Sequence, residues 1–223
     1  MSTVGALPDW LQPLATAARE LLPQELSMFL PPEDGTGRAS AVLVVFTETE
    51  DGPGVLLIER AADMRTHAGQ VAFPGGAADL DDPHRAGTAL REAEEEVGLD
   101  PATVQIVAEL PAIFLPPSGF LVTPVLAWWP QWRPLEPMDP AEVARVAIVS
   151  TAALTDPANR FRVEHPSGWL GPGFEVDGLF VWGFTAVLLD RLITFAGWHR
   201  PWDESRRRAL PERQAGVPPP ATG

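Results

Sequence analysis

The sequence contains no cysteine, and this absence excludes several kinds of chemistry. There can be no disulfide framework, no thiolate nucleophile and no zinc site built on cysteine. Residues 1–24 also lack a basic segment followed by an apolar stretch, the pattern that marks a secretory signal. We therefore expect a cytoplasmic protein without a signal peptide.

Long apolar runs and positive charge are also scarce. The longest apolar run, at residues 179–189, is shorter than the ~20 residues that cross a bilayer, so no membrane span is expected. The 30 acidic residues outnumber the 16 basic ones, which gives a net charge of −14. Because such a field repels polyanions and no basic stripe interrupts it, we expect no nucleic-acid partner. A small phosphorylated ligand would need a metal ion or a few arginines to reverse the charge locally.

The length of 223 residues and the apolar content of 45% are typical of a single globular fold. A loop rich in proline, glycine and acidic residues at 31–38 follows the N-terminal segment. The C-terminal end carries a basic run at 206–208 and finishes in GVPPPATG. We therefore predict an N-terminal helical extension and loop, a main domain and a disordered tail, at residues 1–37, 38–204 and 205–223.

The hydrophobic pattern predicts a mixture of strands and helices. Apolar residues at helical spacing predict one amphipathic helix within residues 8–30. Turn residues at 51–54 separate two β-rich runs and predict a hairpin. We expect strands at residues 41–46, 55–58, 71–73, 104–110, 120–129 and 143–150, and helices at residues 83–97 and 179–196, the second beginning near Trp182 or Gly183. Such a mixture favours an α/β or α+β sandwich.

An acidic segment, REAEEEVGL at residues 91–99, ends the predicted helix before Gly98. At ~100° per residue, Glu92, Glu95 and Glu96 fall within about 100° of one another and share one helix face. Like charges at this spacing cost ~0.2–0.5 kcal/mol per pair, and carboxylates in a last turn oppose the helix dipole. Bound divalent cations would turn this penalty into a benefit, because Mg²⁺ prefers carboxylate oxygens. Taken alone, however, an acidic run favours a solvated helix face.

The residues around this helix resemble a known motif. Residues 76–99, GAADLDDPHRAGTALREAEEEVGL, are similar to the Nudix box, which ends in Arg-Glu, an apolar residue, any residue, Glu-Glu, any residue, glycine and an apolar residue. The residues that fit this second half are Arg91, Glu92, Ala93, Glu95, Glu96, Gly98 and Leu99.

The first half of the box departs from the family pattern. Gly76 lies one position farther from Arg91 than the pattern requires, and Pro83 occupies the place of an early glutamate. In the family, that glutamate mainly braces the loop and the helix. Asp79, Asp81 or Asp82 could replace it, and the sequence leaves these three alternatives open.

A second segment, LLIERAADMRTHAGQVAFPGG at residues 56–76, resembles the additional signature of the coenzyme A diphosphatase branch of the family. The matching residues are Arg60, Met64, Arg65, His67, Gly69, Val71, Ala72, Phe73, Pro74, Gly75 and Gly76. Two arginines and a histidine before the acidic helix are suited to neutralising phosphate oxygens. Each alone is accounted for equally well by surface ion pairing or a structural hydrogen bond, but their order beside the acidic helix favours a site.

The resemblance implies an α/β protein with the Nudix fold, a mixed-sheet α/β/α sandwich. It implies that Arg91 acts with Glu92, Glu95 and Glu96 in catalysis, and that these glutamates hold Mg²⁺ or Mn²⁺ with help from a carbonyl of Gly75 or Gly76. Arg60, Arg65 and His67, with the glycine pair, would bind the substrate. Glu142 resembles an acidic loop residue that supplies a further base or ligand in some relatives, although an exposed glutamate is an equally good account.

The implied activity is hydrolysis of the diphosphate bond of coenzyme A or its derivatives to 4′-phosphopantetheine and adenosine 3′,5′-bisphosphate. Three alternatives stay open: a Nudix enzyme for another nucleoside diphosphate derivative, such as ADP-ribose or a dinucleotide; a noncatalytic nucleotide-binding regulator; and a plain interaction module. The expected partner is a small nucleotide, with no membrane and no nucleic acid, and the chain is either a monomer or a homodimer.

Overall fold

The computed structural model describes residues 6–27, 30–64, 67–116, 118–211 and 214. Its helices are α1 (Gln12–Ala18), α2 (Pro23–Leu26), α3 (Arg85–Val97), α4 (Thr151–Thr155) and α5 (Gly183–Phe195), with 3-10 turns at Pro101–Thr103 and Pro157–Asn159. Its strands are β1 (Arg38–Thr49), β2 (Gly52–Arg60), β3 (Val71–Ala72), β4 (Gly75–Ala77), β5 (Gln105–Glu109), β6 (Ile113–Leu115), β7 (Phe120–Trp129), β8 (Val143–Ser150), β9 (Arg160–Glu164), β10 (Leu170–Val176), β11 (Leu179–Val181) and β12 (Arg207–Ala209). Within the described ranges, no helix is long and apolar enough to span a membrane.

The main sheet is mixed and is built around the parallel pair β1 and β7. Its central order is β3-β2-β1-β7-β5, with β4 added to β1, β6 to β7 and β8 to β2. The predicted hairpin is confirmed, since β1 and β2 pair antiparallel up to the register Thr49↔Gly52. The sheet therefore brings β2, which carries part of the second motif, beside β1 and β4.

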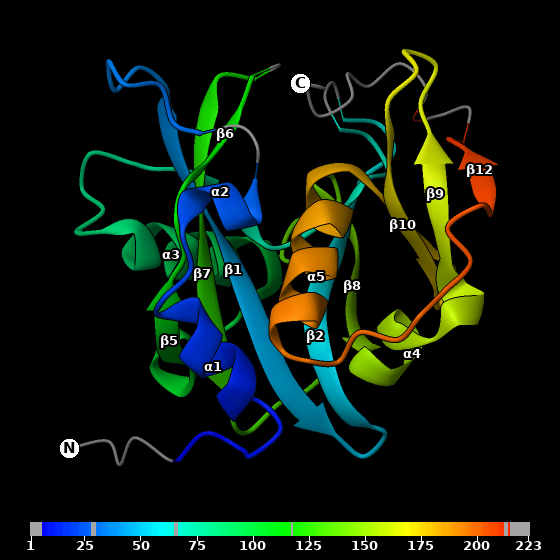
Figure 1. Ribbon diagram of the computed structural model, residues 1–223. Coiled ribbons are helices and arrows are strands. Elements are labelled where there is room, and N and C mark those ends of the chain that lie inside the picture. The colour runs from blue at the N-terminus through cyan, green and yellow to red at the C-terminus, as the bar shows by residue number, and fades with distance from the viewer. Residues whose placement is uncertain (1–5, 28–29, 65–66, 117, 212–213, 215–223) are drawn as a thin grey trace.

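Alternating residues of β1 send their side chains to opposite faces of the sheet, as the pleat requires. Leu43 and Val45 pack with the apolar face of α3, whereas Val44 and Phe46 pack with α1 and α5. Figure 1 shows α5 and α1 on one side of the sheet and α3 on the other. The result is a helix, sheet and helix sandwich, as expected from the sequence.

A second, smaller sheet has the order β11-β10-β9-β12. Its core contains Phe161, Val163, Trp169, Trp182 and Leu210. Because Trp182 is the residue that precedes α5, this sheet is joined directly to the start of that helix. Of these four strands, the sequence predicted none.

Two predictions about the ends of the chain are wrong. The single amphipathic helix within residues 8–30 is two short helices, because Leu22 adopts an extended conformation (φ −94°, ψ 149°) before Pro23, as the residue before a proline favours. The tail from residue 205 is not disordered at residues 207–209, which form β12 in parallel register with β9. Residues 212–213 and 215–223 of that tail lie outside the described residues.

Candidate active site

Helix α3 ends at Val97, as the sequence predicts, and begins at Arg85, two residues after the predicted start, and its caps explain both bounds. The His84 side chain accepts a hydrogen bond from the backbone N–H of Gly87 (3.0 Å), and Glu109 accepts one from Ala86 (3.0 Å). At the other end, Gly98 adopts the left-handed conformation (φ 67°) that a helix C-terminus favours. The acidic segment therefore forms the last turns of a well-defined helix.

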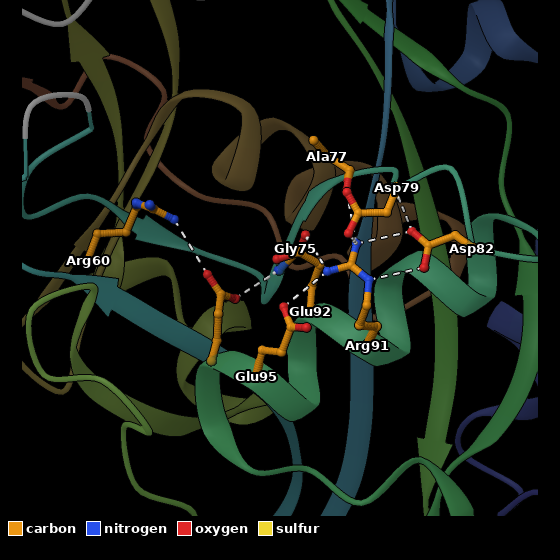
Figure 2. Close-up of polar contacts among 9 residues, drawn as sticks. Arg60, Gly75, Ala77, Asp79, Asp82, Arg91, Glu92 and Glu95 are labelled. Carbon is orange, nitrogen blue, oxygen red and sulfur yellow. Dashed lines mark hydrogen bonds and ion pairs between the residues drawn. The ribbon is translucent and has the colours of Figure 1, made fainter.

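Arg91 is the centre of the polar network on this helix (Figure 2). Its Nε and Nη2 atoms donate to the two carboxylate oxygens of Asp82, each at 3.0 Å, and Nη2 also donates to the carbonyl of Ala77 (3.0 Å). Of the three aspartates left open by the sequence, Asp82 is therefore the one that braces the helix against the preceding loop. Asp79 makes a longer ion pair with Arg91, at 3.8 Å.

The same guanidinium also holds two of the predicted glutamates. Its Nη1 atom donates to Glu92 Oε1 at 3.1 Å and to Glu95 Oε2 at 3.0 Å. Glu92 is largely covered, whereas the Glu95 side chain is 59% exposed. Arg91 thus orients both carboxylates.

Glu96 points away from this cluster toward β2 and β4. Its Oε2 atom accepts a hydrogen bond from the backbone N–H of Gly75 (3.0 Å), and its Oε1 atom lies 3.6 Å from Nη1 of Arg60. Figure 2 shows Arg60 and Arg91 on opposite sides of Gly75. Residues from the two sequence motifs therefore meet at this carboxylate.

Burial changes the protonation of these glutamates. Loss of solvation raises the pKa of Glu96 to about 7, although the Gly75 N–H and Arg60 oppose the shift. Burial likewise raises the pKa of Glu92, against the influence of Arg91. The charges of Glu92 and Glu142 add to the rise at Glu96. The hydrogen bonds from Arg91 have the opposite effect on Asp82, whose pKa is well below its ordinary value.

The structure explains why residues 75 and 76 are both glycine. Gly75 and Gly76 begin strand β4, which pairs with Val42 and Ala41 of β1. A side chain at Gly76 would collide with the carboxylate of Glu92, and one at Gly75 would collide with the β1 backbone. The backbone and the acidic helix are therefore in direct contact.

The donor chemistry of this site fits a hard divalent cation. Glu92, Glu96 and Glu142 offer only oxygen atoms, which Mg²⁺ and Mn²⁺ favour. Burial raises the pKa of both Glu92 and Glu96, and a bound cation would offset this cost of burying their charges. The expected gathering of three glutamates is found only in part. In the described part of the chain, no three His, Asp or Glu side chains surround one point as a metal site would require.

The residues predicted to bind substrate have different surroundings in the structure. Arg60 lies at Glu96, as described above. His67 is exposed, and its Nδ1 atom lies 2.7 Å from the side chain of Gln70. Arg65 lies outside the described residues. Glu142 is exposed but close in the chain to β8, and its carbonyl accepts a hydrogen bond from Ala61 (2.9 Å), the residue after Arg60.

A model of the NUDIX domain matches residues 37–167, which is more than half of the chain. The chain belongs to the Nudix family. It is a Nudix hydrolase, and the mixed-sheet sandwich expected for the family is confirmed. Nudix hydrolases act on phosphoanhydrides and generally use divalent metals such as Mg²⁺ or Mn²⁺.

Curated relatives agree with this assignment. The protein named "Uncharacterized Nudix hydrolase NudL" of Cronobacter sakazakii is 38% identical over 162 residues, which cover 70% of this chain and 81% of the relative. The protein of the same name from Pectobacterium atrosepticum is 53% identical over 89 residues, which cover 40% of this chain and 45% of the relative. Among solved structures, the Nudix hydrolase RenU of M. smegmatis has a TM-score of 0.48 at 19% identity, covering 79% of this chain and 98% of that one.

Several residues that shape the site carry no recognisable signal in the sequence. Asp82 is one of three aspartates in a loop, and Glu109, which caps α3, lies 23 residues beyond the amide it accepts from. Thr185 of α5 donates through Oγ1 to the carbonyl of Val71 (3.0 Å), 114 residues earlier in the chain. Such partners depend on the tertiary arrangement and not on local spacing.

Proposed function

We propose that this Nudix hydrolase cleaves the diphosphate bond of coenzyme A or a derivative of it. The products would be 4′-phosphopantetheine and adenosine 3′,5′-bisphosphate. The observation that carries the proposal is the 3.6 Å approach of Arg60, from the segment that resembles the coenzyme A diphosphatase signature, to Glu96 of the Nudix box. An arginine at this carboxylate can supply the local positive charge that a diphosphate needs in a chain of net charge −14.

Glu92 and Glu96, with Glu95 and a carbonyl of Gly75 or Gly76, are the residues proposed to hold Mg²⁺ or Mn²⁺. When bound, such an ion would offset the charge of the diphosphate and make a water molecule more acidic. Arg91 keeps Glu92 and Glu95 oriented through its two hydrogen bonds, while Asp82 holds Arg91 in place.

The remaining roles concern the orientation of Glu96, the phosphate groups and the proton acceptor. The N–H of Gly75 fixes one oxygen of the Glu96 carboxylate and leaves the other toward Arg60. Arg60 is proposed to contact a phosphate oxygen, with Arg65 and His67 as further phosphate-binding candidates. Glu142, whose charge adds to the rise in the pKa of Glu96, is the candidate proton acceptor.

A turnover screen with product identification tests this function. Purified protein would be incubated with Mg²⁺ or Mn²⁺ and with coenzyme A, acetyl-coenzyme A, ADP-ribose or a diadenosine polyphosphate, and the products would be resolved by mass spectrometry. We expect metal-dependent release of 4′-phosphopantetheine with the highest kcat/KM for coenzyme A compounds. A higher kcat/KM for ADP-ribose or a dinucleotide would refute the substrate assignment.

The nonenzymatic alternatives predict no turnover, and measurements of nucleotide binding and of melting temperature distinguish them. A nucleotide-binding regulator would bind a nucleotide tightly without turnover, and a plain interaction module would show no Mg²⁺-dependent shift in melting temperature. The full set of Glu92, Glu95 and Glu96 supports an enzyme, because a binding module has no need of three acidic groups at a helix C-terminus.

A further inference from the structure

Gln214 is the described residue nearest the C-terminus, and it is completely buried. Its Nε2 atom donates to the carbonyl of Gly69 (2.6 Å), 145 residues earlier, and its Oε1 atom accepts from Nε1 of Trp182 (2.7 Å). Its backbone N–H donates to Pro211 (2.8 Å). A buried amide whose donor and acceptor both have distant partners is a specific connection and not a chance surface contact.

Gly69 belongs to the part of the chain that leads into the site. The N–H of Arg60 donates to the carbonyl of Gln70 (2.9 Å), and the N–H of Gly69 lies 3.4 Å from the carbonyl of Ala61. The backbone at Ala61, the residue after Arg60, is therefore paired with Gly69, which Gln214 holds, and the backbone at Arg60 is paired with the next residue, Gln70. Displacement of Gly69 would move the strand end from which Arg60 reaches Glu96.

The same segment continues to the N–H that holds Glu96. After Gln70, strand β3 pairs with β2, and Thr185 of α5 fixes the carbonyl of Val71. The carbonyl of Pro74 then accepts from Leu43 of β1 (2.8 Å), and Gly75 donates to Glu96. Two side chains from the C-terminal part of the chain, those of Gln214 and Thr185, thus form hydrogen bonds with the backbone of residues 69–75.

We propose that Gln214 is a positioning residue of the active site, which fixes Gly69 so that Arg60 and the N–H of Gly75 converge on Glu96. Gln214 is then a working part of the site, although it lies outside the residues that match the NUDIX domain model. The effect on substrate rests on the proposed diphosphatase function, whereas the effect on residues 69–75 does not.

The first test compares Gln214→Met, which keeps the length of the side chain and removes both hydrogen bonds, with Gln24→Met at an exposed position. In metal-free protein we expect faster hydrogen exchange of the amides in residues 69–75 for Gln214→Met alone. With coenzyme A and Mg²⁺ we expect KM to rise roughly tenfold, with a smaller change in kcat, because buried hydrogen bonds of this kind are worth about a factor of ten.

A second variant separates positioning from general loss of stability. In Gln214→Glu, a protonated carboxyl can donate to Gly69 and accept from Trp182, whereas an ionised one has no donor. The ratio of its kcat/KM to that of the wild type should therefore fall as pH rises, while the same ratio for Gln214→Met stays flat. This variant also decides the question if Gln214→Met fails to fold.

The outcomes distinguish the two proposals. Unchanged hydrogen exchange in residues 69–75 together with an unchanged KM, in folded Gln214→Met protein, would overturn the role of Gln214. A pH-independent ratio for Gln214→Glu would also overturn it. If the wild type hydrolyses none of the diphosphates, the proposed function fails, and the exchange experiment alone decides whether Gln214 positions the segment.

Discussion

Arg91 and Asp82 form a two-pronged ion pair, in which Nε and Nη2 each lie 3.0 Å from a different carboxylate oxygen. This geometry fixes the plane of the guanidinium, and the remaining Nη1 atom is left to hold Glu92 and Glu95. The loop before α3 therefore controls the direction of two proposed metal ligands without touching them.

Replacement of Asp82 should weaken catalysis indirectly. Asp82→Asn removes the charge that pairs with Arg91, so Arg91 and its two glutamates lose their fixed orientation. We expect the Mg²⁺ affinity or the kcat/KM to fall by about 10–100-fold, the usual effect of losing a residue that orients metal ligands. Isothermal titration with Mg²⁺ and steady-state kinetics measure the two quantities. Asp81→Asn, one residue earlier and exposed, is the matched control, and equal losses in both variants would contradict the assignment.

The buried Glu96 makes stability depend on pH in metal-free protein. Its pKa is about 7 in the folded state and 4.5 when unperturbed, so between these values the folded state binds more protons than the unfolded state. Stability must then decrease as pH rises from about 4.5 to about 7, by up to roughly 3 kcal/mol at 1.36 kcal/mol per pKa unit.

Glu96→Gln should remove this dependence. Urea denaturation in the presence of a chelator, at pH 5 and pH 8, gives the free energy of unfolding of both proteins. The free energy of unfolding of the wild type, relative to that of Glu96→Gln, should be lower at pH 8 than at pH 5, because only the wild type then buries a charge. A difference that is the same at both pH values would show that Glu96 ionises normally in the folded protein.

The residues between α5 and β12 should contribute to stability through Trp202. The guanidinium of Arg160, which is 1% exposed, lies between the rings of Phe174 (4.9 Å) and Trp202 (4.8 Å) and is paired with Asp190. Trp202→Ala removes one face of this arrangement and should lower the free energy of unfolding by about 1–3 kcal/mol, whereas Trp202→Phe should cost less because it keeps a ring. Urea denaturation measures both. Identical stability of Trp202→Ala and wild type would argue that residues after α5 do not belong to the folded unit.

Local spacing was sufficient to predict the parts of the site that lie on one helix. The period of the apolar residues and Gly98 located α3, and the same spacing identified Glu92, Glu95 and Glu96 on one face. It could not show that Arg91 contacts Glu92 and Glu95 whereas Arg60 contacts Glu96, because Arg60 lies on β2 and not on α3. Counting along the box also led to Pro83, whereas the brace is Asp82, whose role depends on how the loop folds back over α3.

Long-range pairing explains most of what the sequence did not reveal. Strand β12 is only three residues long and lies parallel to β9, more than 40 residues earlier, so no local pattern marks it. The glycines of β4 have little intrinsic preference for a strand, so the sequence did not predict β4, yet pairing with β1 imposes extended structure on them. Gln214 looked like part of a disordered tail because its partners, Gly69 and Trp182, are distant in the chain.

The central claim is that the charge of Glu96 is required for metal-dependent hydrolysis. Its most direct test is the kcat/KM of purified Glu96→Gln for coenzyme A at saturating Mg²⁺, with circular dichroism to confirm folding and Glu94→Gln, on the exposed side of α3, as the matched control. The account predicts a loss of at least about 100-fold in Glu96→Gln, the scale of removing a key electrostatic group from an active site, and near wild-type activity in the control. Hydrolysis by folded Glu96→Gln at the wild-type rate would contradict it.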